Sequence, residues 1–340
     1  MHTRKKIVFA INNLGMGGAE NMLVEQVRCV DRDLFDPYVI TLLKNQKVNV
    51  IDKLPKDIKF IQFDFTSIFS LYALYKLWAF LRREKIDAII TNLFDTNLLG
   101  RVAAILARVP VIISYELNVD VLKKSWQTKI DRFLAHFTKK ILVSSNEVLD
   151  FTSKQQRIPK SKFLLNFNSI PLKLGEIKKN RNQVLLKYGL PEGQTYIVTA
   201  GSLTPQKGHV HLIDAVSQMK EQGVTGFKIL IFGRGALKDK TLSQIQRLGL
   251  TDDIKLMGIA PVEDIMAISD IFTLPSLWEG LSIALLQAMD AVCPIVATKV
   301  SGTNEVIKDE VSGLLVEPKD PSSLSMAFQR LLNDNELKRK

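Results

Sequence analysis

Short apolar runs alternate with longer amphipathic stretches along the whole chain. In the first half, runs with the composition of buried strands occupy 7–12, 38–43, 59–63, 88–92, 111–114 and 140–144. Stretches with helical periodicity separate them, at 19–30, 70–85, 97–107 and 125–137. This alternation predicts βαβ units, which build parallel sheets through right-handed crossovers.

The second half repeats the pattern. Its apolar runs occupy 196–200, 228–232, 254–257, 271–274, 294–297 and 313–316, and helical stretches include 209–223 and 282–291. The polar stretch 173–194 carries no strand signal, so we place a domain junction near residue 170. We therefore predict an α/β protein of two Rossmann-like, doubly wound domains, 1–170 and 171–340, which bind ligands at the carboxyl ends of their strands.

Charge distinguishes the two halves. Residues 1–170 contain 26 Lys and Arg against 16 Asp and Glu, a net charge of +10, whereas 171–340 contain 20 against 19. A basic domain attracts nucleic acid, an anionic membrane surface or a phosphorylated substrate, and the alternative is a merely solvated basic surface. No window holds the roughly 20 uninterrupted apolar residues of a spanning helix. The start shows no signal peptide, and Cys29 and Cys293 are expected as reduced, buried thiols, so we expect a cytoplasmic protein.

A glycine-rich segment, Gly-Met-Gly-Gly-Ala-Glu at 15–20, follows the first predicted strand. It matches the dinucleotide fingerprint G-x-G-x-x-G only in part, because Glu20 stands at the third glycine position. No acidic residue ends the second strand to hold a ribose. A hydride-transfer enzyme is therefore disfavoured. A turn that lets the backbone approach phosphates or an acceptor is favoured over a purely structural turn.

Two loops of the second half carry charge at strand ends. Lys207 follows the strand at 196–200, where it is well placed to neutralise a diphosphate. Gly233-Arg234-Gly235 ends the next strand, and Arg234 is either a phosphate contact or a solvated charge. The four His and two Cys lack the spacing of metal ligands, so we expect no metal site.

The segment 274–287 predicts a buried strand, a loop with Glu279 and Gly280, and a helix that carries Gln287. The backbone N–H groups and the dipole at the start of that helix suit an anion. A carboxylate beside them suits hydroxyl groups. A sugar nucleotide carries both kinds of group, an anionic diphosphate and the hydroxyls of its sugars.

Together these segments resemble the family 4 retaining glycosyltransferases, which have the GT-B architecture of two Rossmann-like domains facing across a cleft. The resemblance covers essentially the whole chain. It rests on six segments in the family's order, at 15–20, 201–208, 233–235, 269–280, 302–305 and 312–316.

The resemblance implies metal-independent transfer of a sugar, with retained anomeric configuration, from a nucleoside diphosphate donor that we expect to be UDP-linked. No cofactor is expected beyond this substrate. Lys207 would contact the diphosphate and Glu279 the hydroxyls of the transferred sugar, and these two are the expected catalytic residues. Gln287 would bind the ribose and Ile259 would line the base pocket. The other expected donor-binding residues are Gly17, Gly18, Ser202, Gly233, Arg234, Gly280, Leu281, Ser282 and Ile283.

The chain also departs from the family's pattern. Ser202 replaces a frequent phosphate-binding Arg. Gln287 replaces a second glutamate, so a charge-assisted hydrogen bond becomes a neutral one, about half as strong. Tyr115 and Glu116 stand where many members carry a His, and they are the expected acceptor-side residues. The C-terminal helix that usually crosses back onto the first domain is expected to be missing or shortened.

The basic first domain is the acceptor side in this architecture. We therefore expect a glycan or lipid-linked acceptor in cell-surface polysaccharide synthesis, and peripheral contact with the inner face of the membrane. The stretch 69–83 resembles an interfacial helix, and the alternative is a helix packed beneath the strand at 88–92. Two other functions stay open. An inactive partner subunit would explain Ser202 and Gln287, and a nucleic-acid-binding protein would explain the charge but shows no binding motif.

Overall fold

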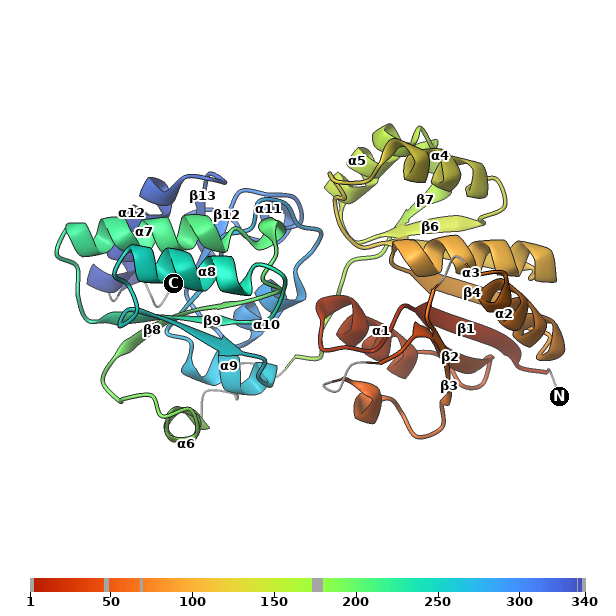
Figure 1. Ribbon diagram of the computed structural model, residues 1–340, viewed down its shortest axis with the longest axis horizontal. Coiled ribbons are helices and arrows are strands. Elements are labelled where there is room, and N and C mark those ends of the chain that lie inside the picture. The colour runs from red at the N-terminus through yellow and green to blue at the C-terminus, as the bar shows by residue number, and fades with distance from the viewer. Residues whose placement is uncertain (1–2, 46–48, 68–69, 173–179, 335, 338–340) are drawn as a thin grey trace. The chain divides into compact units, whose positions relative to one another are not determined.

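The computed structural model describes residues 3–45, 49–67, 70–172, 180–334 and 336–337. The chain divides into two compact units, Met1–Asn168 and Ser169–Lys340 (Figure 1). Phe69 and the last three residues lie outside the described residues. Parts of the interfacial-helix and crossover-helix predictions rest on them.

The first unit contains a parallel sheet with the strand order β3-β2-β1-β4-β5-β6-β7. Its strands are β1 (Lys5–Ile11), β2 (Phe35–Leu43), β3 (Lys59–Phe65), β4 (Ala88–Asn92), β5 (Val111–Glu116), β6 (Lys140–Val143) and β7 (Phe163–Leu165). Its helices are α1 (Gly18–Arg28), α2 (Leu71–Arg83), α3 (Phe94–Ala107), α4 (Ser125–Leu134) and α5 (Asn146–Gln156).

Helices cover both faces of this sheet, so its central strands are apolar at nearly every position. Val8 and Ala10 of β1 face the cluster that contains the buried side chains of α2 and α3. Phe9 and Ile11, which alternate with them, face the cluster that contains those of α1. A strand buried on both faces reads as a continuous apolar run, and this is the pattern that predicted β1.

The second unit contains a parallel sheet with the order β10-β9-β8-β11-β12-β13. Its strands are β8 (Thr195–Ala200), β9 (Phe227–Phe232), β10 (Ile254–Gly258), β11 (Ile271–Leu274), β12 (Ile295–Thr298) and β13 (Leu314–Val316). Its helices are α6 (Arg181–Lys187), α7 (His209–Glu221), α8 (Lys238–Arg247), α9 (Val262–Ile268), α10 (Ile283–Asp290), α11 (Thr303–Val306) and α12 (Pro321–Asn333). One core packs α7, α8 and α12 on the sheet, and the other packs α6, α9 and α10 (Figure 1).

All twelve predicted strands are present, and β7 is a strand that the pattern missed because three residues are too few to show a period. The expectation that both thiols are buried is wrong for Cys29, which caps the end of α1 and is exposed, whereas Cys293 is buried. Within the described residues, no helix is both long and apolar enough to cross a membrane.

Candidate active site

The candidate site of the second unit lies where its strand order changes direction, between the adjacent parallel strands β8 and β11. The loop after β8 spans 201–208 and the loop after β11 spans 275–282. In a doubly wound sheet, the carboxyl ends of the strands at such a switch point form the usual ligand crevice. The topology therefore brings Lys207 and Glu279 to one place.

Hydrogen bonds fix these two loops to one another. The backbone N–H of Leu277 donates to the carbonyl of Gln206 at 2.7 Å, and Gln206 Nε2 donates to the carbonyl of Trp278 at 3.0 Å. From the next strand, Thr298 Oγ1 donates to the carbonyl of Ser276 at 2.5 Å. Because neighbouring strands anchor the contacts, the loops form a preorganised support rather than two separate turns.

Glu279 is 4% exposed, and its carboxylate contacts three donors. Its carboxylate forms an ion pair with Lys207 Nζ. Ser276 Oγ donates to Oε1 at 2.7 Å and Gln206 Nε2 donates to Oε2 at 3.3 Å. Burying a carboxylate is costly unless it is paired and hydrogen-bonded. The site therefore contains an ammonium and a carboxylate side by side, held in fixed positions.

Gly208 lets the loop after β8 approach the loop after β11. Its φ is +63°, and a Cβ at this position would overlap the carbonyl oxygen of Pro275. A side chain there would therefore push apart the backbone segments that carry Lys207 and Glu279.

We expect Gly208→Ala to weaken nucleotide binding by about tenfold or more, since the carbonyl of Pro275 must move to admit the methyl group. Gly223→Ala is the matched control, because Gly223 has a φ of +76° with nothing within 4 Å of the added Cβ. The control carries only the cost of the positive φ, about 1 kcal/mol of stability. Calorimetric titration measures the affinity of each variant for UDP. Equal affinities of the two variants would show that UDP binding does not require the close approach of Gly208 to Pro275.

The turn after β9 is bound to the loop after β8. Gly233 has a φ of +149°, and a Cβ there would overlap the carbonyl oxygen of Gly201. The N–H of Leu203 donates to the carbonyl of Arg234 at 2.9 Å. Arg234 and Ser202 are exposed, and Ser202 Oγ lies 3.2 Å from Thr204 Oγ1. These contacts bring Arg234 onto the same loop edge as Lys207.

The start of α10 completes this edge. Ser282 caps the helix, its Oγ accepting from the N–H of Leu285 at 3.4 Å. Gly280 and Leu281 are buried, and Ile283 is half-buried. Gly302, with a φ of +20°, packs against the carbonyl of Gly280, where a Cβ would overlap. The eight-residue helix α10 begins at Ile283, four residues after Glu279.

Two further predicted residues flank this edge. Gln287 is half-buried on the second turn of α10, and Ile259 is half-buried directly after β10. His209, at the start of α7, is 5% exposed, and Nε2 has no hydrogen-bond partner within the described residues. Burial, together with the positive charge of Lys207, lowers the pKa of His209 to about 4, so the ring is neutral at physiological pH.

The remaining predicted residues belong to the first unit. Gly17 caps α1 and Gly18 begins it, with Asn21 Nδ2 donating to the carbonyl of Gly17 at 2.8 Å. Tyr115 is 1% exposed, burial raises its pKa to about 12, and its hydroxyl donates to the carbonyl of Asn166 at 2.6 Å. The Tyr115 hydroxyl thus already donates its hydrogen bond to another residue of the protein. Contact of these residues with a ligand stays a prediction.

Glu116 belongs to a buried charge network that sequence reasoning missed. Its carboxylate lies 3.2 Å from Lys123 Nζ, which also lies 2.8 Å from Asp131. Asp131 pairs in turn with Arg101. Burial lowers the pKa of Lys123, but the charges of Glu116 and Asp131 outweigh it and hold the pKa above its ordinary value. The network ties α4 to α3 and to the end of β5.

Sequence reasoning also missed Gln206 and Ser276 as partners of Glu279. Both stand inside quoted motif segments, but nothing in the sequence pairs them with a carboxylate. Within the described residues, no three His, Cys, Asp or Glu side chains group as a metal site would require.

Two family descriptions match the chain, one for each unit. Residues 16–173 match Glycosyltransferase Family 4, and residues 180–340 match Glycosyl transferases group 1. Together they span nearly all of both units.

Individual proteins extend the similarity. The chain is 28% identical over 278 residues to an Escherichia coli enzyme, UDP-Gal:alpha-D-GlcNAc-diphosphoundecaprenol alpha-1,3-galactosyltransferase, a match that covers 79% of this chain and 71% of that enzyme. It is 26% identical to a Campylobacter jejuni alpha-1,4-N-acetyl-D-galactosaminyltransferase acting on GalNAc-alpha-(1->4)-GalNAc-alpha-(1->3)-diNAcBac-PP-undecaprenol, over 98% of this chain and 90% of that enzyme.

Among solved structures, Anabaena HepE in complex with UDP and glucose aligns with a TM-score of 0.81 at 20% identity, over 99% of this chain and 92% of that chain. This likeness, with the two parallel sheets, confirms the predicted GT-B fold class. Family matches to both units and a shared fold lead to one assignment. The chain belongs to the family 4 glycosyltransferases.

Proposed function

We propose that the protein transfers a sugar from UDP to a lipid-linked glycan, with retention of anomeric configuration and without a bound metal. The observation that carries the proposal is the Lys207–Glu279 pair, held at the switch point of the second unit beside the start of α10. The E. coli relative is named for a UDP-galactose donor and an undecaprenyl diphosphate-linked acceptor. The Campylobacter relative is also named for an undecaprenyl diphosphate-linked acceptor.

The start of α10 and Lys207 supply positive potential for the donor diphosphate. Backbone N–H groups at 281–283 and the helix dipole attract an anion, and the ammonium of Lys207 adds a full charge. In the structure this ammonium forms an ion pair with the carboxylate of Glu279. A bound diphosphate would contact the Lys207 ammonium together with Glu279, and the oxygens of Glu279 would accept hydrogen bonds from the sugar hydroxyls.

Transfer proceeds by direct charge stabilisation in this proposal. The bond between the anomeric carbon and the diphosphate oxygen breaks, and the acceptor hydroxyl bonds to the same face of that carbon. Its proton leaves with the diphosphate. Preorganised charge around the departing group supplies the main rate effect, because it needs no reorganisation during the reaction. Gln287 and Ile259 would hold the ribose and the base.

The acceptor side belongs to the basic first unit in this proposal, with the protein working at the cytoplasmic face of a membrane. Family membership disfavours the nucleic-acid-binding alternative. The inactive-partner alternative makes a different prediction, which is donor binding without turnover.

A thermal-shift screen of nucleotides tests the donor assignment, since only ligands that bind the folded state raise its stability. UDP at about 100 times its dissociation constant should add about 2.7 kcal/mol of stability. Adenine and guanine nucleotides at the same concentration should add far less. A shift produced equally by every nucleotide, or by none, would contradict the proposed donor.

A further inference from the structure

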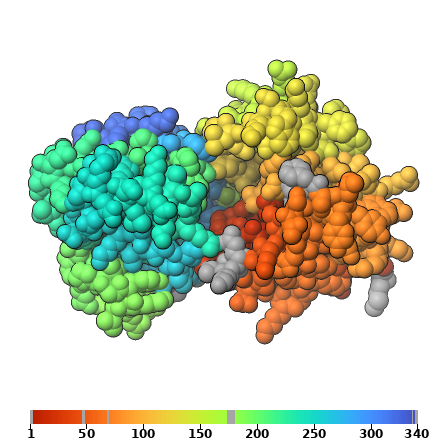
Figure 2. Space-filling model, in the orientation of Figure 1, coloured from red at the N-terminus to blue at the C-terminus, as the bar shows by residue number. Residues whose placement is uncertain are grey.

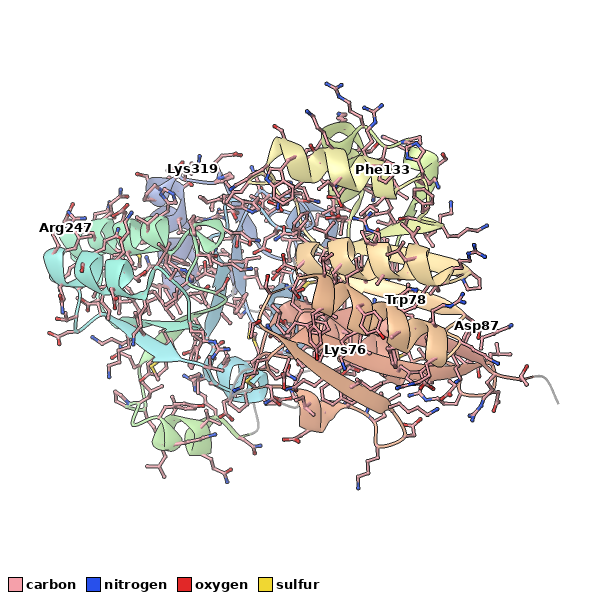
Figure 3. All side chains as sticks on the ribbon, turned by 45° about the vertical axis from the view of Figure 1, so that its right-hand side comes forward. Lys76, Trp78, Asp87, Phe133, Arg247 and Lys319 are labelled. Atoms are coloured by element: carbon pink, nitrogen blue, oxygen red, sulfur yellow. The ribbon has the colours of Figure 1, made fainter. Side chains whose placement is uncertain are left out.

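Helix α4 of the first unit carries an exposed aromatic stripe. Trp126, Phe133 and Phe137 are 44%, 63% and 50% exposed, and the rings of Phe133 and Phe137 meet edge-on at 5.7 Å. Their spacing places the first two on one face of the helix, and Phe137 continues that line in the turn that follows. Figure 3 labels Phe133 on this helix. Leu122, in the loop before α4, is 70% exposed.

Basic side chains surround the stripe. Asp131 is the one acidic residue between 121 and 140, and it is 1% exposed inside the network with Arg101 and Lys123. Every exposed charged side chain of this segment is therefore positive. They are Lys124, Lys129, Arg132 and Lys139.

The opposite face of α4 explains why the stripe points outward. Asp131 and Leu134 are buried, and the ion pair with Arg101 fixes the helix to α3. Trp126 rests edge-on against Phe94 of α3, with ring centroids 5.8 Å apart. The core thus determines the rotation of α4 and leaves the aromatic stripe in water. Figure 2 shows this segment in yellow at the surface of the first unit.

We propose that the α4 surface, defined as Leu122, Lys124, Trp126, Lys129, Arg132, Phe133, Phe137 and Lys139, docks the protein on an anionic lipid bilayer. The inference rests on the proposed function and names the surface that brings the enzyme to its lipid-linked acceptor. Aromatic rings suit the headgroup level, and long basic side chains reach anionic lipids around them. An exposed apolar patch whose own segment exposes charge of one sign only suits an anionic membrane surface.

Helix α2, which the sequence offered as a candidate interfacial helix beside the alternative of a packed helix, fits this role less well. Its exposed apolar residues, Leu71, Tyr72 and Tyr75, lie in its first two turns. Of its three basic residues, Lys76 lies among these apolar residues, over the Tyr72 ring, and Arg82 and Arg83 lie at the other end. On α4 the exposed apolar and basic side chains alternate from turn to turn. Insertion of the aromatic rings and attraction of the basic side chains to anionic lipids can therefore act at the same place.

Co-sedimentation with lipid vesicles tests the α4 surface. Wild-type protein should bind phosphatidylcholine vesicles that contain roughly 30% phosphatidylglycerol at least about tenfold more tightly than phosphatidylcholine alone. Phe133→Ser/Phe137→Ser and Lys129→Glu/Arg132→Glu should each lower binding to the mixed vesicles at least about tenfold. The matched control, Met326→Ser, replaces a 59% exposed apolar residue of α12 and should leave binding unchanged.

The same variants must keep the UDP-dependent thermal shift, which shows that they fold and separates this test from that of the proposed function. Three results would overturn the inference. One is wild-type protein that ignores phosphatidylglycerol. Another is loss of binding in Tyr72→Glu/Tyr75→Glu but not in Phe133→Ser/Phe137→Ser. The third is a wild-type dimer that the Phe133→Ser/Phe137→Ser change converts to monomer, because the stripe would then join two copies of the chain.

Discussion

Replacing Lys207 by alanine is expected to lower kcat/KM for sugar transfer by about 10²- to 10³-fold. In the proposed mechanism, this ammonium stabilises the charge on the departing diphosphate. Ser202, on the same loop, offers no second cation, and Arg234 is exposed. The loss should appear mainly in kcat, since the interaction strengthens as the leaving group gains charge.

Two companion variants show whether this loss is chemical or structural. Lys207→Arg keeps the charge beside Glu279 and should recover part of the rate. Lys220→Ala removes an exposed lysine of the same unit, which pairs with Asp253 at 2.7 Å, and should leave kcat/KM unchanged. Steady-state kinetics measures all three. Wild-type turnover by Lys207→Ala would show that this ammonium is not part of the reaction.

Replacing Asp131 by alanine is expected to destabilise the first unit by about 3–5 kcal/mol. The change leaves the cations of Arg101 and Lys123 buried without their shared carboxylate, although Glu116 still lies 3.2 Å from Lys123. Removing one partner of a buried ion pair costs far more than the pair contributes, because the remaining charges stay desolvated.

An exposed ion pair provides the comparison. Glu310 accepts two hydrogen bonds from Arg330, at 2.7 and 2.8 Å, but both side chains are about half exposed. Glu310→Ala should therefore cost about 1 kcal/mol or less. Urea unfolding in a Trp278→Phe background leaves Trp78 and Trp126 as reporters of the first unit, and a Trp78→Phe/Trp126→Phe background leaves Trp278 as the reporter of the second unit, where Glu310 lies. An Asp131→Ala variant as stable as Glu310→Ala would show that the network does not hold α4.

Local sequence patterns predicted most of the fold, because strands buried on both faces are continuous apolar runs. Boundaries were less accurate where a distant residue sets them. Helix α3 begins at Phe94, three residues before the predicted start at 97. Asn12 accepts hydrogen bonds from the N–H and the hydroxyl of Thr96, at 3.2 and 2.5 Å, and so stabilises the first turn. No local signal predicts a contact across 84 positions.

The candidate site shows the same division. The sequence predicted Lys207 and Glu279 as site residues from their loops, and the structure places them together as an ion pair. It did not reveal that Gly208 is required by the carbonyl of Pro275, or that Ser276 and Gln206 bind Glu279. The Gly208–Pro275 and Gln206–Glu279 contacts join loops 67 and 73 residues apart, whereas Ser276 lies in the same loop as Glu279, and side-chain type alone encodes none of these contacts.

The most direct test of the central claim is a transfer assay with UDP-sugars and undecaprenyl diphosphate-linked acceptors in vesicles, in the presence of EDTA. The wild-type chain should release UDP and extend an acceptor by one sugar with the donor's anomeric configuration. Glu279→Gln, which keeps the shape of the side chain but not its charge, should lose about 10²-fold or more of that rate. Wild-type protein that binds UDP yet turns over no donor across the acceptor panel would contradict the account and identify an inactive partner subunit.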